Sequence, residues 1–181
     1  MNNSFVETTD VRDGLYPSLR KLFVAFENTL SKDNFKLSAN AIAPVAKSLN
    51  TSLDDIYYNL LDTMKPRCEL PLMSGCGNFG FTPSAPQFTQ IYPSEFFYNV
   101  LSMQDNIDVN QPFIMPVPYA LVAGTIGTCE SVSKIPTHNL AEVIDATIAL
   151  INNPDIETSE LLRYIKGPDL LVGGTIENPE K

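Results

Sequence analysis

Hydrophobic residues in the first third of the chain recur every three or four positions, which is the period of a helix with one buried side. The first such stretch covers positions 15–30 and predicts an amphipathic helix. A second covers positions 36–50, where Pro44 is expected to distort or delay the helix. A third follows Ser52, which can cap it together with Asp55. Two short helices joined by a tight polar turn predict a helix-turn-helix.

The pattern changes between positions 69 and 132, where short apolar runs are broken by glycine and proline. Such runs are typical of strands and extended loops, and Tyr119-Ala-Leu-Val-Ala-Gly is one of them. One more helix is expected from about Ser94 to Met103. This part of the chain is therefore predicted to be rich in β-structure.

Two further helices are predicted towards the end of the chain, one from Leu140 to Ile151 and one from Ser159 to Ile165. Asn139 and Glu142 have the spacing of a capping box at the start of the first. Helices followed by strands and then helices predict an α+β fold in a single domain over residues 1–181. We expect a winged-helix core at residues 10–90 and a β-rich segment with closing helices at residues 91–181.

The charge balance weakens the case for a simple DNA-binding regulator, with 21 acidic against 12 basic residues and a formal net charge of -9. Nonspecific DNA affinity comes mainly from cations that displace phosphate counterions. The third helix, from Leu53 to Met64, would be the one that enters the major groove. It carries Asp54, Asp55 and Asp62 and neither lysine nor arginine, which favours packing or protein pairing over DNA reading.

The sequence contains few features that indicate a cellular location or a metal site. The chain has no apolar run long enough for a membrane span and no signal peptide at its start, so a cytoplasmic protein is expected. The three cysteines lack metal-site spacing, and we expect no metal site and reduced cysteines in the core. His138, the one histidine, precedes the capping Asn139 and is expected to make a structural hydrogen bond.

Four stretches carry a family resemblance, and they are Asp10-Val-Arg-Asp-Gly-Leu, Gly77-Asn-Phe-Gly80, Ile135-Pro-Thr-His-Asn-Leu and Ile165-Lys-Gly-Pro-Asp. In this order and spacing they resemble the A subunit of bacterial type IIA topoisomerases, DNA gyrase and topoisomerase IV. The resemblance implies a winged-helix breakage domain that works with a B subunit. That B subunit binds the magnesium and ATP, so no cofactor is expected in this chain.

The cleavage residues implied by the resemblance are altered. In this family a tyrosine attacks a phosphodiester of DNA, and an adjacent arginine supports the developing charge. The family's A-[AM]-x-R-Y-T-E element resembles Ser84-Ala-Pro-Gln-Phe-Thr-Gln90, which places Phe88 at the tyrosine and Gln87 at the arginine. Because phenylalanine has no oxygen with which to attack phosphorus, this alignment predicts a chain that is inactive in cleavage.

A competing alignment assigns the nucleophile to Tyr92. Counting from Gly80 without a gap places Tyr92 about where the family's tyrosine falls, whereas the Phe88 alignment requires a deletion of four residues. Tyr92 has no cation beside it, and its other interpretation is a packed aromatic.

Seven positions fall where the family contacts DNA, and they are Lys36, Asn40, Asn50, Ser52, Asp54, Tyr58 and Thr128. Lys36, Asp54 and Tyr58 match the family's residue types. Asn40 instead stands at an arginine, Asn50 and Ser52 at two histidines, and Thr128 at an isoleucine that wedges between base pairs. DNA binding is therefore expected to be weak.

The resemblance ends with the last residues of the chain, so the tower and coiled-coil gate of the family are expected to be absent. We expect a non-catalytic interaction or regulatory protein of topoisomerase or DNA, which pairs with itself, an A subunit or a B subunit. The alternative is a residual type IIA cleavage subunit that uses Tyr92 with a partner B subunit.

Overall fold

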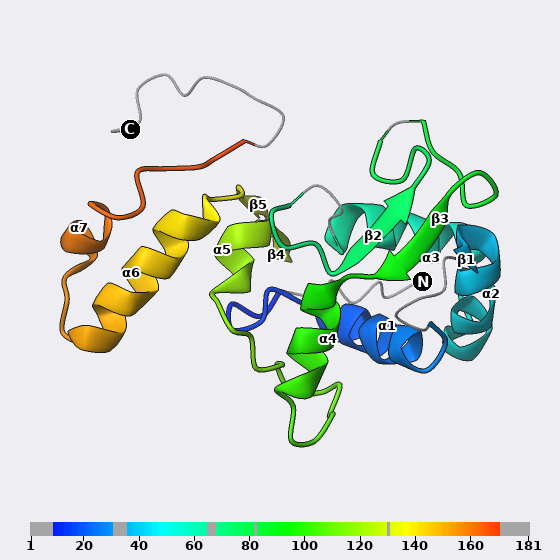
Figure 1. Ribbon diagram of the computed structural model, residues 1–181, viewed down its shortest axis with the longest axis horizontal. Coiled ribbons are helices and arrows are strands. Elements are labelled where there is room, and N and C mark those ends of the chain that lie inside the picture. The colour runs from blue at the N-terminus through cyan, green and yellow to red at the C-terminus, as the bar shows by residue number, and fades with distance from the viewer. Residues whose placement is uncertain (1–8, 31–35, 65–67, 82, 130, 171–181) are drawn as a thin grey trace.

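The structure, a computed structural model, describes residues 9–30, 36–64, 68–81, 83–129 and 131–170 of the chain. Helices are combined with two small antiparallel sheets, which confirms the predicted α+β class (Figure 1). The elements are α1 (Pro17–Glu27), β1 (Lys36–Leu37), α2 (Ser38–Leu49), α3 (Leu53–Thr63), β2 (Met73–Cys76), β3 (Gln90–Pro93), α4 (Glu95–Ser102), α5 (Tyr119–Ala123), β4 (Thr125–Cys129), β5 (Ser131–Ile135), α6 (Leu140–Asn152) and α7 (Thr158–Leu161).

The predicted helices of the first third are present, with one correction at Pro44. The second helix, α2, begins at Ser38, so Pro44 lies inside it and does not delay it. Pro44 is exposed, and the Asn40 carbonyl that it leaves without a helical partner is on an exposed residue too, so water can reach it. The cap of α3 is confirmed, because Ser52 Oγ accepts a hydrogen bond from the backbone N–H of Asp55 at 3.0 Å.

The larger sheet joins parts of the chain that are far apart in sequence. Its strand order is β1-β3-β2, and all pairs are antiparallel. Lys36 of β1 pairs with Ile91 of β3, and Cys76 of β2 pairs with Gln90 of β3. The central strand β3 therefore links the segment before α2 with the segment after α3.

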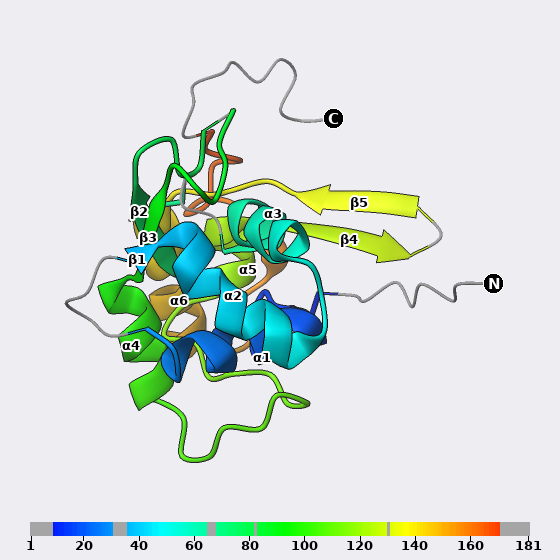
Figure 2. The ribbon, with the colours of Figure 1, turned by 90° about the vertical axis from the view of Figure 1, so that its right-hand side faces the viewer.

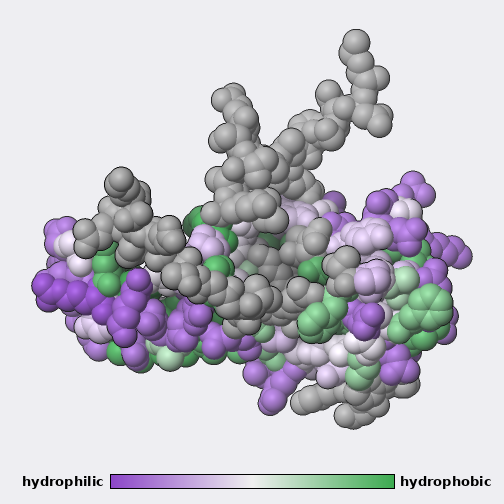
Figure 3. All heavy atoms as spheres, turned by 90° about the horizontal axis from the view of Figure 1, so that it is seen from above, coloured by the Kyte–Doolittle hydropathy of each residue, from purple (hydrophilic) through white to green (hydrophobic). Residues whose placement is uncertain are grey.

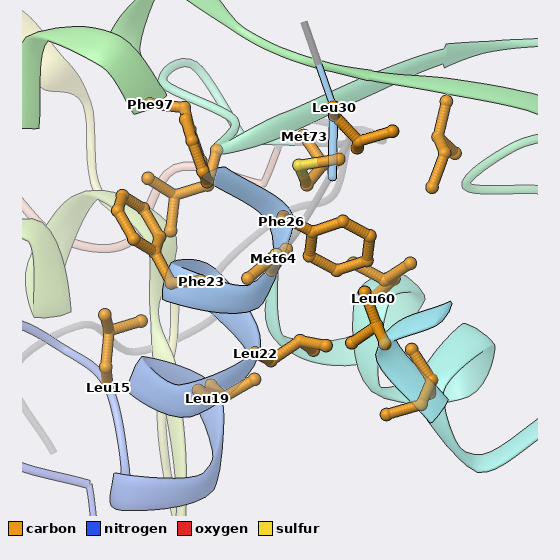
Figure 4. Packing of buried hydrophobic residues seen from close by; sticks show 14 of the residues in the cluster. Leu15, Leu19, Leu22, Phe23, Phe26, Leu30, Leu60, Met64, Met73 and Phe97 are labelled. Atoms are coloured by element: carbon orange, nitrogen blue, oxygen red, sulfur yellow. The ribbon is translucent and has the colours of Figure 1, made fainter. Parts of the chain in front are cut away.

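One hydrophobic core holds the first helices against this sheet. The buried face of α1 carries Leu19, Leu22, Phe23 and Phe26, and it faces residues of α3, β2 and α4 (Figure 4). The rings of Phe23 and Phe97 stack with centroids 4.0 Å apart. Burial of apolar surface on this scale is the main stabilising contribution to the fold.

A buried ion pair explains the first resemblance motif. Asp13 is fully buried, and its carboxylate accepts hydrogen bonds from Arg20 Nε at 2.6 Å and from the backbone N–H of Phe113 at 2.9 Å. Arg20 is 3% exposed. The motif therefore ties the start of α1 to a loop one hundred residues later, and it is structural in this fold.

The second half of the chain differs from the prediction at α5. Residues Tyr119–Ala123 were expected to be extended but form a short helix that begins after Pro118 and buries most of its side chains. A short apolar run is compatible with either a buried strand or a buried helix, and its period cannot separate the two. The ribbon of β4 and β5 extends away from the rest of the molecule (Figure 2).

The closing helices are α6 and a short α7. Asn139 caps α6 as predicted, accepting from the backbone N–H groups of Ala141 and Glu142. The capping-box role of Glu142 is wrong, because its carboxylate accepts from the backbone N–H of Lys166 at 3.1 Å. The structural role of His138 is confirmed, since its ring and its backbone N–H both contact the Leu121 carbonyl.

Two smaller expectations have mixed outcomes. Cys68 is buried as predicted, but Cys76 is exposed, because it lies at the end of β2 where the strand leaves the core. The side chain of Cys129 lies outside the described residues. Within the part of the chain that the structure describes, no helix has the length and apolar character needed to cross a membrane.

Candidate functional site

The loop between β2 and β3, residues 77–89, lies against the amino-terminal end of α2. The first two backbone N–H groups of α2 donate to this loop, from Ser38 to the Thr89 carbonyl at 2.8 Å and from Ala39 to the Pro86 carbonyl at 2.9 Å. The first N–H groups of a helix have no partner within the helix, so these contacts satisfy two of them. The helix end and the loop therefore form one unit.

Three buried hydroxyl groups reinforce this contact. Thr89 Oγ1 donates to the Ala85 carbonyl at 3.1 Å, and it lies 2.8 Å from Ser38 Oγ and 3.0 Å from Tyr57 Oη. A hydroxyl has one proton and two lone pairs, so with its proton on Ala85 the Thr89 oxygen accepts from Ser38 and Tyr57. Thr89 thus connects the loop to both α2 and α3.

Glycine makes the close approach of the loop possible. Gly77 has φ +77, and a Cβ placed on it would lie 2.8 Å from the Phe88 carbonyl oxygen. Residues other than glycine rarely adopt this backbone conformation, and the Phe88 carbonyl leaves no room for a methyl group on Gly77. The G-N-F-G stretch therefore allows the two arms of the loop to pass close to each other.

Phe88 and Gln87 both lie on the surface of this loop. The Phe88 side chain is 83% exposed, although the neighbouring Thr89 is buried. The end of the molecule that holds α2 and β3, at the right in Figure 3, shows hydrophobic groups beside hydrophilic ones on its surface. The anchored backbone at Thr89 therefore holds the Phe88 ring out on the surface, where another molecule can contact it.

Phe88 borders an open pocket of about 550 Å³, whose lining residues are Gly77, Asn78, Pro83, Ser84, Ala85, Phe88 and Thr89. The lining contains neither a carboxylate nor a cationic side chain. It therefore does not fit a magnesium ion, which prefers carboxylate and phosphate oxygens. Among the residues that the structure describes, no group of three or more His, Cys, Asp or Glu is arranged to hold a metal ion.

Tyr92 lies in a different setting from Phe88. It is a half-buried residue in the central strand β3, opposite Ser74 of β2. Its neighbours Ile91 and Pro93 are buried, and side chains alternate between the faces of a strand, so Tyr92 lies on the less covered face.

The seven positions expected to contact DNA do not form one cluster. Asn50, Ser52 and Asp54 are exposed and close together, at the turn between α2 and α3 and in the first turn of α3. Asn50 has φ 51, the left-handed conformation that asparagine tolerates, and ends α2. Asn40 is exposed in the first turn of α2, beside the residues that hold the loop.

The remaining three positions lie elsewhere. Tyr58 is on α3, where its side chain is 58% exposed. Lys36 is half-buried, and its ammonium donates to the Thr29 carbonyl at 3.0 Å. Thr128 belongs to β4, where its backbone pairs with Val132, and its side chain lies outside the described residues. The structure therefore brings Asn40 towards the Phe88 loop, and it groups the turn residues separately. Thr89 was not singled out from the sequence, although it directly follows Phe88.

Comparisons with known proteins agree with the resemblance. Residues 8–181 match the family of the DNA gyrase/topoisomerase IV A subunit. The DNA gyrase A subunit of Kosmotoga olearia is 34% identical over 188 aligned positions, which cover 92% of this chain and 23% of that protein. For the chloroplastic/mitochondrial DNA gyrase A subunit of Nicotiana benthamiana the identity is 33%, covering 92% of this chain and 20% of that protein.

The DNA topoisomerase 4 A subunit of Synechocystis sp. is 32% identical, covering 94% of this chain and 21% of that protein. The chain thus spans between a fifth and a quarter of the length of these relatives. The match runs over nearly all of this chain and includes the four motifs, the loop at residues 77–89 and the α2–α3 pair. The chain belongs to the family of the DNA gyrase/topoisomerase IV A subunit.

Proposed function

We propose that this chain is an A-subunit-like protein that does not cleave DNA and acts by binding another topoisomerase subunit or a second copy of itself. The proposal rests on the alignment that assigns Phe88 to the position of the family's tyrosine, and the exposure of Phe88 on the loop held against α2 supports it. A phenyl ring has no oxygen to form a bond to phosphorus. Gln87 is neutral where the family has arginine, so charge support for a transition state is reduced as well.

We further propose that residues 10–90 form a winged helix, with the rest of β3 completing its sheet. The element order α1, β1, α2, α3, β2, β3 and the strand order β1-β3-β2 support this assignment. In that description α2 and α3 are the helix-turn-helix, and the β2–β3 loop that carries Phe88 is the wing. The hydroxyl group of Thr89 joins wing and helices.

DNA binding by this face is proposed to be weak. The exposed first turn of α3 carries Asp54 and Asp55, and α3 contains neither lysine nor arginine. Carboxylates repel phosphates, and the chain as a whole has a formal net charge of -9. Asn40, Asn50 and Ser52 can donate hydrogen bonds to phosphate oxygens, but they add no positive charge.

Magnesium and ATP are proposed to be bound by a partner of the B type and not by this chain. The lining of the pocket beside Phe88 supports this for magnesium, because it offers no carboxylate. No step in the function proposed for this chain requires either group.

A second candidate function is residual cleavage through Tyr92. Tyr92 keeps a phenol hydroxyl and lies on the less covered face of the central strand, which is the observation in its favour. It predicts a covalent protein–DNA adduct that depends on the Tyr92 hydroxyl and on a B subunit with magnesium.

The proposed function is tested by adding the purified chain to a gyrase reconstituted from separate A and B subunits. In size-exclusion chromatography we expect the chain to elute as a dimer or together with one of these subunits. A bound chain is expected to change the supercoiling rate in proportion to its concentration, whereas an unrelated acidic protein of similar size does not. Absence of both binding and altered supercoiling would contradict the proposal.

A further inference from the structure

Helix α6 has two apolar sides, and the fold covers one of them. Val143 and Ala146 are buried at 1% and 6% exposure. Ile144, Ile148 and Ile151, called here the α6 stripe, are exposed at 37%, 51% and 72%. Successive residues of a helix are about 100° apart, so the stripe lies on a different side from Val143 and Ala146. Figure 1 shows α6 at the end of the molecule opposite to α2.

Exposed apolar residues are concentrated around this helix. Of the fifteen large hydrophobic side chains exposed in the described part of the chain, seven fall within residues 140–170, and they are Ile144, Ile148, Leu150, Ile151, Leu162, Tyr164 and Leu170. Single exposed apolar residues are normal on a protein surface, whereas grouped ones mark an interaction site. The concentration here favours a partner surface.

The spacing of the stripe indicates what shape of partner fits. Its members are four and then three residues apart, as are the a and d positions of a coiled-coil heptad. Such a seam packs along the apolar stripe of another helix. A helical partner therefore matches this surface.

The surrounding charge indicates the chemistry of that helix. Exposed acidic residues near the stripe are Asp145 on α6 itself and Asp155, Glu157 and Glu160 between α6 and the end of α7. The exposed cations of this part of the chain are Arg163 and Lys166, and Lys166 Nζ lies 3.7 Å from the Glu142 carboxylate. The surface is therefore predominantly acidic.

We propose that the α6 stripe is the docking site for a basic amphipathic helix of another protein. Apolar residues of that helix would pack on the three isoleucines, and its lysines or arginines would lie beside Asp145 and the acidic residues after α6. A second copy of α6 fits less well, because α6 carries no lysine or arginine and would bring acidic flanks together. This inference rests on α6 and the residues that follow it, and it does not depend on the role of Phe88.

The test uses the whole chain and a fluorescent synthetic helix with leucine at heptad a and d positions and lysine at e and g. Two control peptides are a scramble of the same composition and a version with glutamate in place of lysine. Fluorescence anisotropy is expected to give a Kd at least about tenfold lower for the lysine helix than for either control. The double variant Ile148→Ser/Ile151→Ser is expected to raise that Kd about tenfold or more.

Ile114→Ser is the matched control variant, because Ile114 is 53% exposed and lies in a loop outside α6. It is expected to leave the Kd unchanged. Asp145→Lys gives an independent test, since it should weaken binding of the lysine helix and strengthen binding of the glutamate helix. Circular dichroism and Tm report whether each variant is folded.

Three results would overturn the proposal. The first is equal binding of the lysine helix and its scramble, which would show charge attraction alone. The second is equal loss of binding in Ile114→Ser and in the α6 double variant. The third is self-association of the chain that the double variant abolishes, without binding of the lysine helix, because the occupant would then be a second copy.

Discussion

The hydroxyl oxygens of Ser38 and Thr89 lie 2.8 Å apart, although 51 positions separate the two residues in the chain. The contact is buried and is shared with Tyr57, so it anchors the β2–β3 loop to both α2 and α3. Phe88 directly precedes Thr89, and its ring is exposed. The surroundings of Phe88 are therefore set by long-range hydrogen bonds, while its side chain remains accessible.

Removing the Thr89 hydroxyl should destabilise the fold. Thr89→Val keeps the shape of the side chain but leaves the buried hydroxyls of Ser38 and Tyr57 without this acceptor. An unsatisfied buried polar group costs about 1–3 kcal/mol, which urea unfolding would measure. The control Thr51→Val changes an exposed residue and should cost within about 0.5 kcal/mol. Equal costs for the two variants would show that the hydroxyl contact contributes nothing.

Gly77→Ala should disturb the loop that carries Phe88. The new methyl group would meet the Phe88 carbonyl at 2.8 Å, and the backbone would keep a φ of +77. We expect a loss of about 1–3 kcal/mol in the free energy of unfolding. A Gly77→Ala variant as stable as the wild type would contradict the close approach.

The buried ion pair predicts that replacing Arg20 lowers the free energy of unfolding much more than replacing Arg12 does. Arg20→Met leaves the fully buried Asp13 carboxylate without its partner, which costs about 3–5 kcal/mol. Arg12→Met removes an exposed partner of Asp10 and should cost much less, because an exposed ion pair is screened by water. Chemical denaturation of both variants measures the difference. If Arg20→Met is as stable as Arg12→Met, the pair does not hold α1 to the Phe113 loop.

Tyr119 predicts a loss of stability at alkaline pH. Burial, with a smaller contribution from nearby Cys68, raises the pKa of its phenol well above 10. The unfolded chain ionises this group near its ordinary pKa of about 10, so the folded state holds the proton more tightly above that pH. The contribution is fully present below about pH 10 and is lost as pH rises further.

Tyr119→Phe should therefore flatten the fall of unfolding free energy above about pH 10, measured by denaturation at a series of pH values. Tyr58→Phe changes an exposed side chain and should keep the wild-type slope. Identical slopes for wild type and Tyr119→Phe would show that the buried phenol has no part in the alkaline transition.

Local signals explain what the sequence could predict of the fold. Helix α1 follows from the spacing of its leucines and phenylalanines, and Ser52 and Asn139 are capping residues that act within three positions. The short α5 was missed because five apolar residues fit a buried strand equally well. Pro44 was expected to delay α2, but an exposed helix position tolerates its missing N–H.

The candidate site could be predicted only in part. Phe88 and Gln87 were predicted as site residues from their resemblance to a family element, which needs no knowledge of the fold, and this assignment stays a prediction. The anchoring of their loop depends on contacts of Thr89 with Ser38 and Tyr57, and such distant pairs have no local sequence signal. The same applies to the hydrogen bond between Asp13 and Phe113.

A search for a covalent protein–DNA adduct tests most directly whether this chain has lost cleavage. The chain is incubated with magnesium, end-labelled DNA and the B subunit of a gyrase, and the mixture is rapidly denatured; the A subunit of that gyrase is the positive control. We predict an adduct for the control and none for this chain, because Phe88, which we propose occupies the nucleophile position, carries no oxygen. An adduct that persists in Phe88→Ala and disappears in Tyr92→Phe would contradict this account.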